Sequence, residues 1–235
     1  LTCALPILTV SELKARFDSI EKIKKGGQKL VYKAICSTGE TVALKIISDA
    51  TDPRVLQEIS LVKALSMSCV PKIIESGIVT DEAVNEDVLY IIEQYIDGIS
   101  LRDWINKKHT ANLKFAYTLL EALLYAEIDL ERNNILHRDI NPNNIILGED
   151  GVIYLIDFGL SKNIGGVSFT QTAAAHGPFT PGYAPHEQFA NMKLIQDVRT
   201  DLFHIGITIY ECCVGTNPFV KPNETIFQIM EKTRT

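Results

Sequence analysis

The residues best suited to chemistry lie in two short runs, HRDINPNN at 137–144 and IDFG at 156–159. Asp139 and Asn144 are five residues apart on a loop that is expected to enter a strand, and Asp157 follows an apolar strand-like stretch. Transfer of a phosphoryl group to a hydroxyl requires an acceptor for the hydroxyl proton and oxygen ligands for Mg²⁺. We expect Asp139 to accept the proton, and Asn144 and Asp157 to bind the metal.

A second feature lies about a hundred residues upstream, in the strand-like run VALK at 42–45. Strand alternation places Ala43 and Lys45 on one face, opposite to the face that carries Val42, Leu44 and Ile46. We expect Ala43 to cover an adenine ring and Lys45 to reach the phosphates of the nucleotide. A buried lysine needs a carboxylate to stay charged, and Glu58 on the following helix is the predicted partner.

The run KKGGQK at 24–29 is a weaker signal for phosphate binding. Gly26 and Gly27 would let the backbone N–H groups approach phosphates closely. Lysines would add positive charge there, at Lys24, Lys25 and Lys29. A plain basic hairpin turn explains the same residues, so both interpretations remain open.

These residues need a scaffold, and the first half of the chain predicts a small β-rich lobe. Residues 17–47 read as an antiparallel meander, and further strands are expected at 72–79 and 88–96. Between them a helix is expected, with Asp52 as its cap, Pro53 at its first position and a buried stripe at Val55, Ile59 and Val62.

After the turn at Asp97 and Gly98 the pattern becomes mainly helical. A long helix is predicted to bury one face, made of Leu113, Ala116, Tyr117, Leu120, Leu123, Leu124 and Ile128. A hairpin should turn at 148–151, and helices should return at 200–214 and 224–232. The fold class is therefore α+β, with one lobe at 17–97 and a second at 98–235.

Composition excludes several classes of protein. The 235 residues carry 23 basic and 29 acidic side chains, a net charge of −6, which argues against a nucleic-acid binder. The five cysteines have no metal-ligand spacing, and Cys212 and Cys213 are expected to be buried free thiols in a reducing, cytoplasmic setting. The longest late apolar run, 202–214, is too short to span a bilayer, so no membrane segment is expected.

Together the motifs resemble those of the eukaryotic-type serine/threonine protein kinase family, in a bacterial-like variant, over residues 17–232. The resemblance implies a bilobal fold, ATP and Mg²⁺ as cofactors, and a protein substrate that offers a Ser or Thr hydroxyl, as in signalling by protein phosphorylation. Gln94 and Ile96 would contact adenine through their backbone, at the hinge between the lobes. The ring itself would lie between Val31, Ala43 and Ile146. Glu93 stands just before the hinge, where the family usually has an apolar or small residue.

Other implied roles lie in the second half. TPGYAPHEQ at 180–188 resembles the end of an activation segment, with Glu187 as its structural glutamate. Asp201 resembles the aspartate that ties a core helix to the catalytic loop. Ser168, Thr170 and Thr172 could carry regulatory phosphates that pair with Arg138. A polar loop without phosphates explains the same residues, so both interpretations remain open. The family normally continues beyond residue 235 with further helices and a basic partner for Glu187. We therefore expect a C-terminally truncated chain whose full-length form carries additional domains.

Asn141 is the main departure from the family pattern, because serine/threonine kinases usually carry a lysine two residues after the catalytic aspartate. Losing a positioned cation costs on the order of 2–4 kcal/mol of transition-state stabilisation. The leading interpretation is an active kinase in which Asn141 belongs to the catalytic set with Asp139, Lys45 and Glu58. A catalytically impaired relative that acts as a nucleotide-binding or scaffold module is the alternative. A small-molecule phosphotransferase is a third interpretation, although such enzymes usually show His-Gly-Asp in place of HRD.

Overall fold

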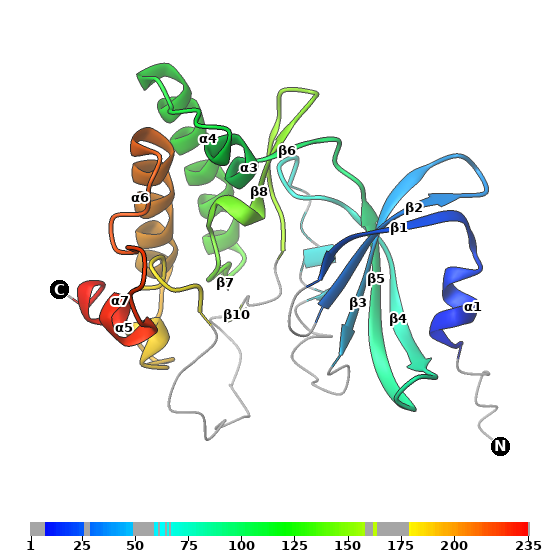
Figure 1. Ribbon diagram of the computed structural model, residues 1–235. Coiled ribbons are helices and arrows are strands. Elements are labelled where there is room, and N and C mark those ends of the chain that lie inside the picture. Colours follow the sequence, from blue (N-terminus) through cyan, green and yellow to red (C-terminus); the bar gives the residue numbers. More distant parts are fainter. Residues whose placement is uncertain are drawn as a thin grey trace. The chain divides into compact units, whose positions relative to one another are not determined.

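The computed structural model describes residues 8–25, 29–48, 59–60, 62–63, 65, 67–157, 162–163 and 179–234 (Figure 1). The chain divides into two compact units. The first comprises Leu1–Ser66 and Pro71–Ile96, and the second comprises Met67–Val70 and Asp97–Thr235. Each unit is treated below on its own.

A five-stranded antiparallel sheet forms the first unit. Its strands are β1 (Phe17–Lys25), β2 (Lys29–Cys36), β3 (Thr41–Ser48), β4 (Ile73–Asp81) and β5 (Glu86–Gln94), arranged in the order β1-β2-β3-β5-β4. The predicted meander and the two later strands are thus confirmed. Strand β5 lies between β3 and β4, and its residues Val88–Glu93 are buried, with apolar clusters on both faces of the sheet.

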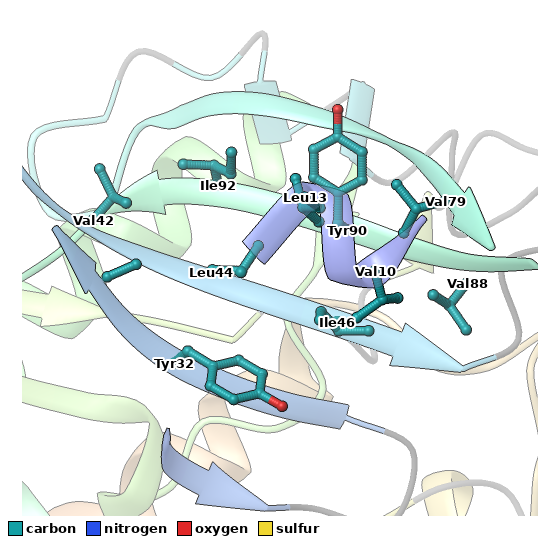
Figure 2. Packing of buried hydrophobic residues seen from close by; sticks show 11 residues of the cluster. Val10, Leu13, Tyr32, Val42, Leu44, Ile46, Val79, Val88, Tyr90 and Ile92 are labelled. Carbon is teal, nitrogen blue, oxygen red and sulfur yellow. The ribbon is translucent and has the colours of Figure 1, made fainter. Parts of the chain in front are cut away.

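One face of this sheet is covered by a short helix that the sequence reading did not predict. Helix α1 (Val10–Lys14) begins with a capping box between Thr9 and Glu12, and it packs Val10 and Leu13 onto the sheet (Figure 2). The alternation expected for β3 is confirmed, because this apolar cluster contains Val42, Leu44 and Ile46.

The opposite face of the sheet carries a second apolar cluster. Leu89 and Ile91 of β5 pack with Ile59, and the partly buried Ile47 and Ile73 border them. Backbone at residues 59–60 and 62–63 is helical, as predicted for this stretch, and both Ile59 and Val62 are buried. The predicted start of that helix at Asp52 and Pro53 lies outside the described residues, as does Val55.

The second unit contains five described helices: α3 (Leu101–Asn106), α4 (Leu113–Arg132), α5 (His186–Phe189), α6 (Val198–Val214) and α7 (Ile226–Lys232). The predicted long helix that begins at Leu113 and the predicted helices at 200–214 and 224–232 are therefore present. Strands β6 (Gly98–Ser100), β8 (Ile145–Gly148) and β9 (Ile153–Leu155) form a small sheet that includes the predicted hairpin. Strand β7 (Ile135–Leu136) pairs with β10 (Lys162–Asn163) just before the catalytic loop.

The prediction for the buried face of α4 was partly wrong. Leu113, Tyr117 and Ile128 are exposed, with relative accessibilities of 89%, 62% and 41%. The helix instead buries Ala116, Leu119, Leu123, Ala126, Glu127 and Leu130. Apolar residues occur on both the buried and the exposed face of α4, so apolar periodicity alone does not identify the buried stripe.

The cysteines divide in a similar way. Cys212 is fully buried but Cys213 is exposed, so the prediction that both are buried was wrong for Cys213. Consecutive residues on an α-helix point about 100° apart, and α6 has one face toward the core. Within the part of the chain that the structure describes, no helix is long and apolar enough to cross a membrane.

Candidate active site

The predicted catalytic loop follows β7 and ends in the short 3₁₀ helix η1 (Pro142–Asn144). Its centre is the carboxylate of Asp139, which accepts three side-chain hydrogen bonds. Oδ1 accepts from Thr180 Oγ1 at 2.6 Å and from Asn141 Nδ2 at 2.9 Å, and Oδ2 accepts from Asn144 Nδ2 at 2.7 Å. These donors hold the carboxylate in one orientation, as a proton acceptor for a substrate hydroxyl requires.

Both the nitrogen and the oxygen of the Asn141 side-chain amide form hydrogen bonds within the loop. Its Nδ2 donates to the backbone carbonyl and the carboxylate of Asp139, each at 2.9 Å. Its Oδ1 accepts from the backbone N–H and the side-chain amide of Asn143, each at 3.0 Å, and so caps η1. The side chain is only 2% exposed. Asn141 therefore supports the orientation of Asp139 and brings no positive charge.

The two predicted metal ligands lie on adjoining backbone. The N–H of Ile156 donates to the carbonyl of Asn144 at 2.8 Å, and Asp157 follows directly. The amide nitrogen of Asn144 donates to Asp139, so its Oδ1 is the atom that the side chain can offer to a cation. No group of three His, Cys, Asp or Glu side chains among the described residues could hold a metal. Two oxygen ligands nevertheless suit Mg²⁺, which keeps several waters and binds substrate phosphates as well.

The backbone is strained in the catalytic loop and at Asp157, and a buried aspartate holds the loop in this conformation. Arg138 has a φ of 64° and Asp157 a φ of 77°, which are left-handed values that side chains with a Cβ rarely adopt. Asp201 on α6 accepts the backbone N–H groups of His137 and Arg138, both at 2.6 Å, and is itself fully buried. The contact that the resemblance implied for Asp201 is thus present, and it fixes the backbone next to Asp139.

His137 is a structural member of the same loop. Its ring is fully buried, and burial lowers the pKa of the imidazole. Nε2 lies 3.2 Å from the carbonyl of Ile156, and Nδ1 accepts the backbone N–H of Asp139 at 3.3 Å. A neutral imidazole protonated at Nε2 satisfies both contacts. The ring therefore connects the backbone of Asp139 to that of the strand leading to Asp157.

In the first unit, the predicted phosphate-binding lysine forms a buried ion pair. Lys45 Nζ lies 2.6 Å from Glu93 Oε1, and the two side chains are 9% and 11% exposed. The predicted partner Glu58 lies outside the described residues, so that pairing remains a prediction. Sequence reading noted Glu93 as unusual but did not connect it to Lys45. Alternation along β5 was the available signal, because it places Glu93 on the same face as Ile91.

Strand register also places the predicted adenine contacts of this unit together. Val31 lies opposite Lys45, so Val31 shares a face of the sheet with Lys45 and Ala43. The N–H of Gln94 donates to the carbonyl of Lys72 at 2.9 Å, and Ile96 is buried just beyond the strand. Contact of Gln94 and Ile96 with a base remains a prediction.

Several predicted site residues are not placed with the others. Ile146 lies on β8 in the second unit, whereas Val31 and Ala43 belong to the first. Gly26 and Gly27 lie outside the described residues, and so do Ser168, Thr170 and Thr172. Arg138, the expected phosphate partner, donates through its guanidinium to the side chain of Gln196.

The segment after residue 179 contains a network that the sequence did not reveal. Arg102 Nη1 lies 2.6 Å from Glu211 Oε1, and Arg102 Nη2 lies 2.5 Å from the hydroxyl of Tyr183, which also donates to Glu211. Burial, together with Glu211, raises the pKa of Tyr183, so the hydroxyl keeps its proton. Nothing in the spacing of α3 and α6 signals this contact. It ties the TPGY run to the helical core.

Glu187, which was expected to lack a partner inside this chain, accepts a hydrogen bond from Thr200 Oγ1 at 3.0 Å. It is only partly buried. A hydroxyl donor and partial hydration therefore take the place of the expected basic partner. An unpaired buried charge would be costly, and the Thr200 contact together with partial exposure avoids that cost for Glu187.

Comparisons with known proteins agree with this arrangement. A model of the protein kinase domain matches residues 17–235. Among curated proteins, the chain is 29% identical over 211 residues to the probable serine/threonine-protein kinase CPE1738 of Clostridium perfringens, covering 87% of this chain and 29% of that protein. It is 30% identical over 220 residues to the serine/threonine-protein kinase PknB of Mycobacterium tuberculosis, covering 90% of this chain and 34% of PknB.

A third relative is the probable serine/threonine-protein kinase SCO3848 of Streptomyces coelicolor, 30% identical over 221 residues, with 88% of this chain and 31% of that protein covered. The chain thus spans roughly a third of the length of these relatives. The matched region contains the five-stranded sheet, the catalytic loop with Asp139, and α6 with Asp201. On these grounds the chain belongs to the protein kinase domain family.

Proposed function

We propose that this chain is a protein serine/threonine kinase that transfers the γ-phosphoryl group of ATP to Ser or Thr hydroxyls of protein substrates. The observation that carries the proposal is the fixed carboxylate of Asp139. Three side-chain donors hold it, and one of them, Asn144, is also a predicted metal ligand. The names of the curated relatives support the same class of reaction.

In the proposed reaction Asp139 accepts the proton of the substrate hydroxyl as the hydroxyl oxygen bonds to the γ-phosphorus. The bond from that phosphorus to the bridging oxygen breaks, and ADP leaves. Lys45 would bind the nucleotide phosphates, and Asn144 with Asp157 would hold Mg²⁺. Bound Mg²⁺ neutralises the charge of the phosphate oxygens. The lobe at 17–97 would bind the nucleotide, and the lobe at 98–235 would supply the catalytic loop.

The finer parts of the proposal concern setting and partners. We propose a cytoplasmic location, since ATP is available there and the four described cysteines are free thiols. We also propose that further domains in the full-length protein select its substrates, because the relatives extend well beyond the matched region. The net charge of −6 argues against nucleic acid as a partner.

A specific observation favours a second candidate function, a catalytically impaired nucleotide-binding or scaffold module. Asn141 stands where the family has a lysine, and both ends of its amide are engaged within the loop. A positive charge beside the transferred phosphoryl group must therefore come from elsewhere in the protein, or be lacking.

Transfer of labelled γ-phosphate from MgATP to dephosphorylated casein distinguishes the two functions. We expect transfer by the native chain, and a loss of at least about a thousandfold in Asp139→Asn with MgATP binding retained. Asp150→Asn is the control, because Asp150 is an exposed aspartate in the turn between β8 and β9. Binding of MgATP without transfer by the native chain would favour the scaffold function. Transfer that survives Asp139→Asn would exclude the proposed role of Asp139.

A further inference from the structure

Glu93 occupies an unusual position for a carboxylate. It lies near the end of β5, which is paired with β3 and β4, and only 8% of the residue is exposed. Its neighbours on the same face of β5 are the buried Leu89 and Ile91. Strand β3 alongside places Ala43 directly opposite Glu93. A charged group here is surrounded mainly by apolar side chains and backbone.

The partner of Glu93 explains how the charge is accommodated. Lys45 lies opposite Ile91, so Lys45 and Glu93 are diagonal neighbours on one face of two paired strands. Their charged atoms are 2.6 Å apart. Burying both ions costs desolvation free energy that an ion pair rarely recovers in full, and an apolar replacement of similar size is often as stable or more so. Stability of the sheet is therefore a poor reason for having Glu93.

We propose that Glu93 is a positioning residue for Lys45: it keeps the ammonium charged and fixes its place on the sheet before the nucleotide binds. Both residues belong to the paired strands β3 and β5, so this contact lies within one pair of neighbouring strands. An ammonium has three N–H donors, so it can contact phosphate oxygens as well as protein carboxylates. The role of Lys45 toward phosphates rests on the proposed function.

The location of Glu93 connects the two ends of the proposed nucleotide site within this unit. Glu93 directly precedes Gln94, where the base would be contacted, and its carboxylate holds Lys45, where the phosphates would bind. A carboxylate also repels phosphate, so the ion pair must remain tight for Glu93 to help binding. The inference therefore predicts that removing only the charge of Glu93 weakens MgATP binding.

The first experiment measures the protonation of Lys45 directly, without nucleotide. The 235-residue chain is treated with acetic anhydride over a range of pH, and acetylation of each lysine is followed by peptide mass spectrometry. In Glu93→Gln, the buried ammonium loses the negative charge that lies 2.6 Å away, so the neutral, reactive amine should form at lower pH. We expect about a tenfold higher rate at Lys45 at pH 8. Lys22, which is exposed on the same sheet, should react at its native rate.

Two further variants separate positioning from stability. Glu93→Met replaces the carboxylate with an apolar side chain of similar size and should unfold at a temperature no lower than native. Glu75→Gln is the matched control, since Glu75 forms a carboxylate ion pair with Arg16 at 2.7 Å on the same sheet. It should leave Lys45 acetylation and MgATP affinity unchanged.

The second experiment measures MgATP affinity by calorimetry. We expect the dissociation constant for MgATP to be about tenfold higher in Glu93→Gln and Glu93→Met than in the native chain. In Glu93→Asp it should return part of the way to the native value. Unchanged acetylation of Lys45 in Glu93→Gln would overturn the inference, and so would MgATP affinity that is equal to or higher than native. Failure of the proposed kinase activity would be a separate result. The native chain would then bind MgATP without phosphoryl transfer, while Glu93→Gln would still raise the acetylation rate of Lys45.

Discussion

The hydroxyl of Thr180 donates a hydrogen bond of 2.6 Å to Oδ1 of Asp139. This contact connects the TPGY run to the catalytic loop, 41 residues earlier in the chain. The same oxygen accepts from Asn141, whereas Oδ2 accepts from Asn144. Hydrogen bonds to a charged acceptor are stronger than neutral ones, and here they decide which way the carboxylate faces.

The first prediction concerns that hydroxyl. Thr180→Val keeps the shape of the side chain and removes the donor, so Asp139 loses one of its three side-chain contacts. We expect kcat for phosphoryl transfer to fall about tenfold or more, with KM for MgATP changed little. Thr180→Ser retains the donor and should stay within about threefold of native. Equal kcat values for the valine variant and the native chain would show that the contact is dispensable.

The second prediction concerns the residue that departs from the family pattern. Asn141→Lys introduces a positive charge next to Asp139, and we expect kcat to rise about tenfold. The variant also loses the cap of η1, so the free energy of unfolding should fall by about 1 kcal/mol. Transfer kinetics and urea unfolding measure the two effects. Asn143→Lys is the control for added charge nearby, and a similar gain in both variants would exclude a specific role for position 141.

The third prediction follows from a buried acid on α4. Glu127 is 2% exposed, and neither of its carboxyl oxygens has a hydrogen-bond partner among the described residues. Burial, and then the nearby carboxylates of Asp201 and Glu131, raise the pKa of Glu127 from 4.5 to about 9. In the folded chain the group is therefore protonated at neutral pH, whereas in the unfolded chain it is ionised.

A carboxyl group whose pKa is raised by folding makes the folded state less stable as pH rises. The loss begins near pH 4.5, where the unfolded chain ionises, and ends near pH 9, where the folded chain does. Glu127→Gln removes this titration, so its stability relative to the native chain should be about 4 kcal/mol higher at pH 8 than at pH 5. Urea unfolding at both pH values measures the difference, with the exposed Glu121→Gln as control. A difference that is the same at pH 5 and pH 8 would contradict the assignment.

The sequence predicted the strands well because their patterns are local. Alternation in VALK correctly separated Leu44 from Lys45, and the turn chemistry located the β8–β9 hairpin. Helix α4 was harder, since both of its faces carry apolar residues. Tyr117 and Ile128 could not be told from core residues by periodicity, and the buried Glu127 was not predicted because it is polar.

Contacts between distant residues were the least predictable part of the site. Asp139, Asn144 and Asp157 were recognised from short motifs, because their spacing along the chain is characteristic. The pairing of Lys45 with Glu93 depends on the register between β3 and β5, and this register could not be deduced from the sequence. The contact of Arg102 with Glu211 joins residues 109 positions apart, and no local pattern indicates it.

Helix α1 shows that the conserved domain and the folding unit have different boundaries. The kinase domain match begins at residue 17, yet Val10 and Leu13 before it belong to the core of the sheet. Burial of two such side chains contributes about 3–5 kcal/mol. A shortened chain that starts at residue 17 would expose Leu44, Val79 and Ile92 to water. Such a chain should aggregate during purification, although every residue of the proposed chemistry is still present.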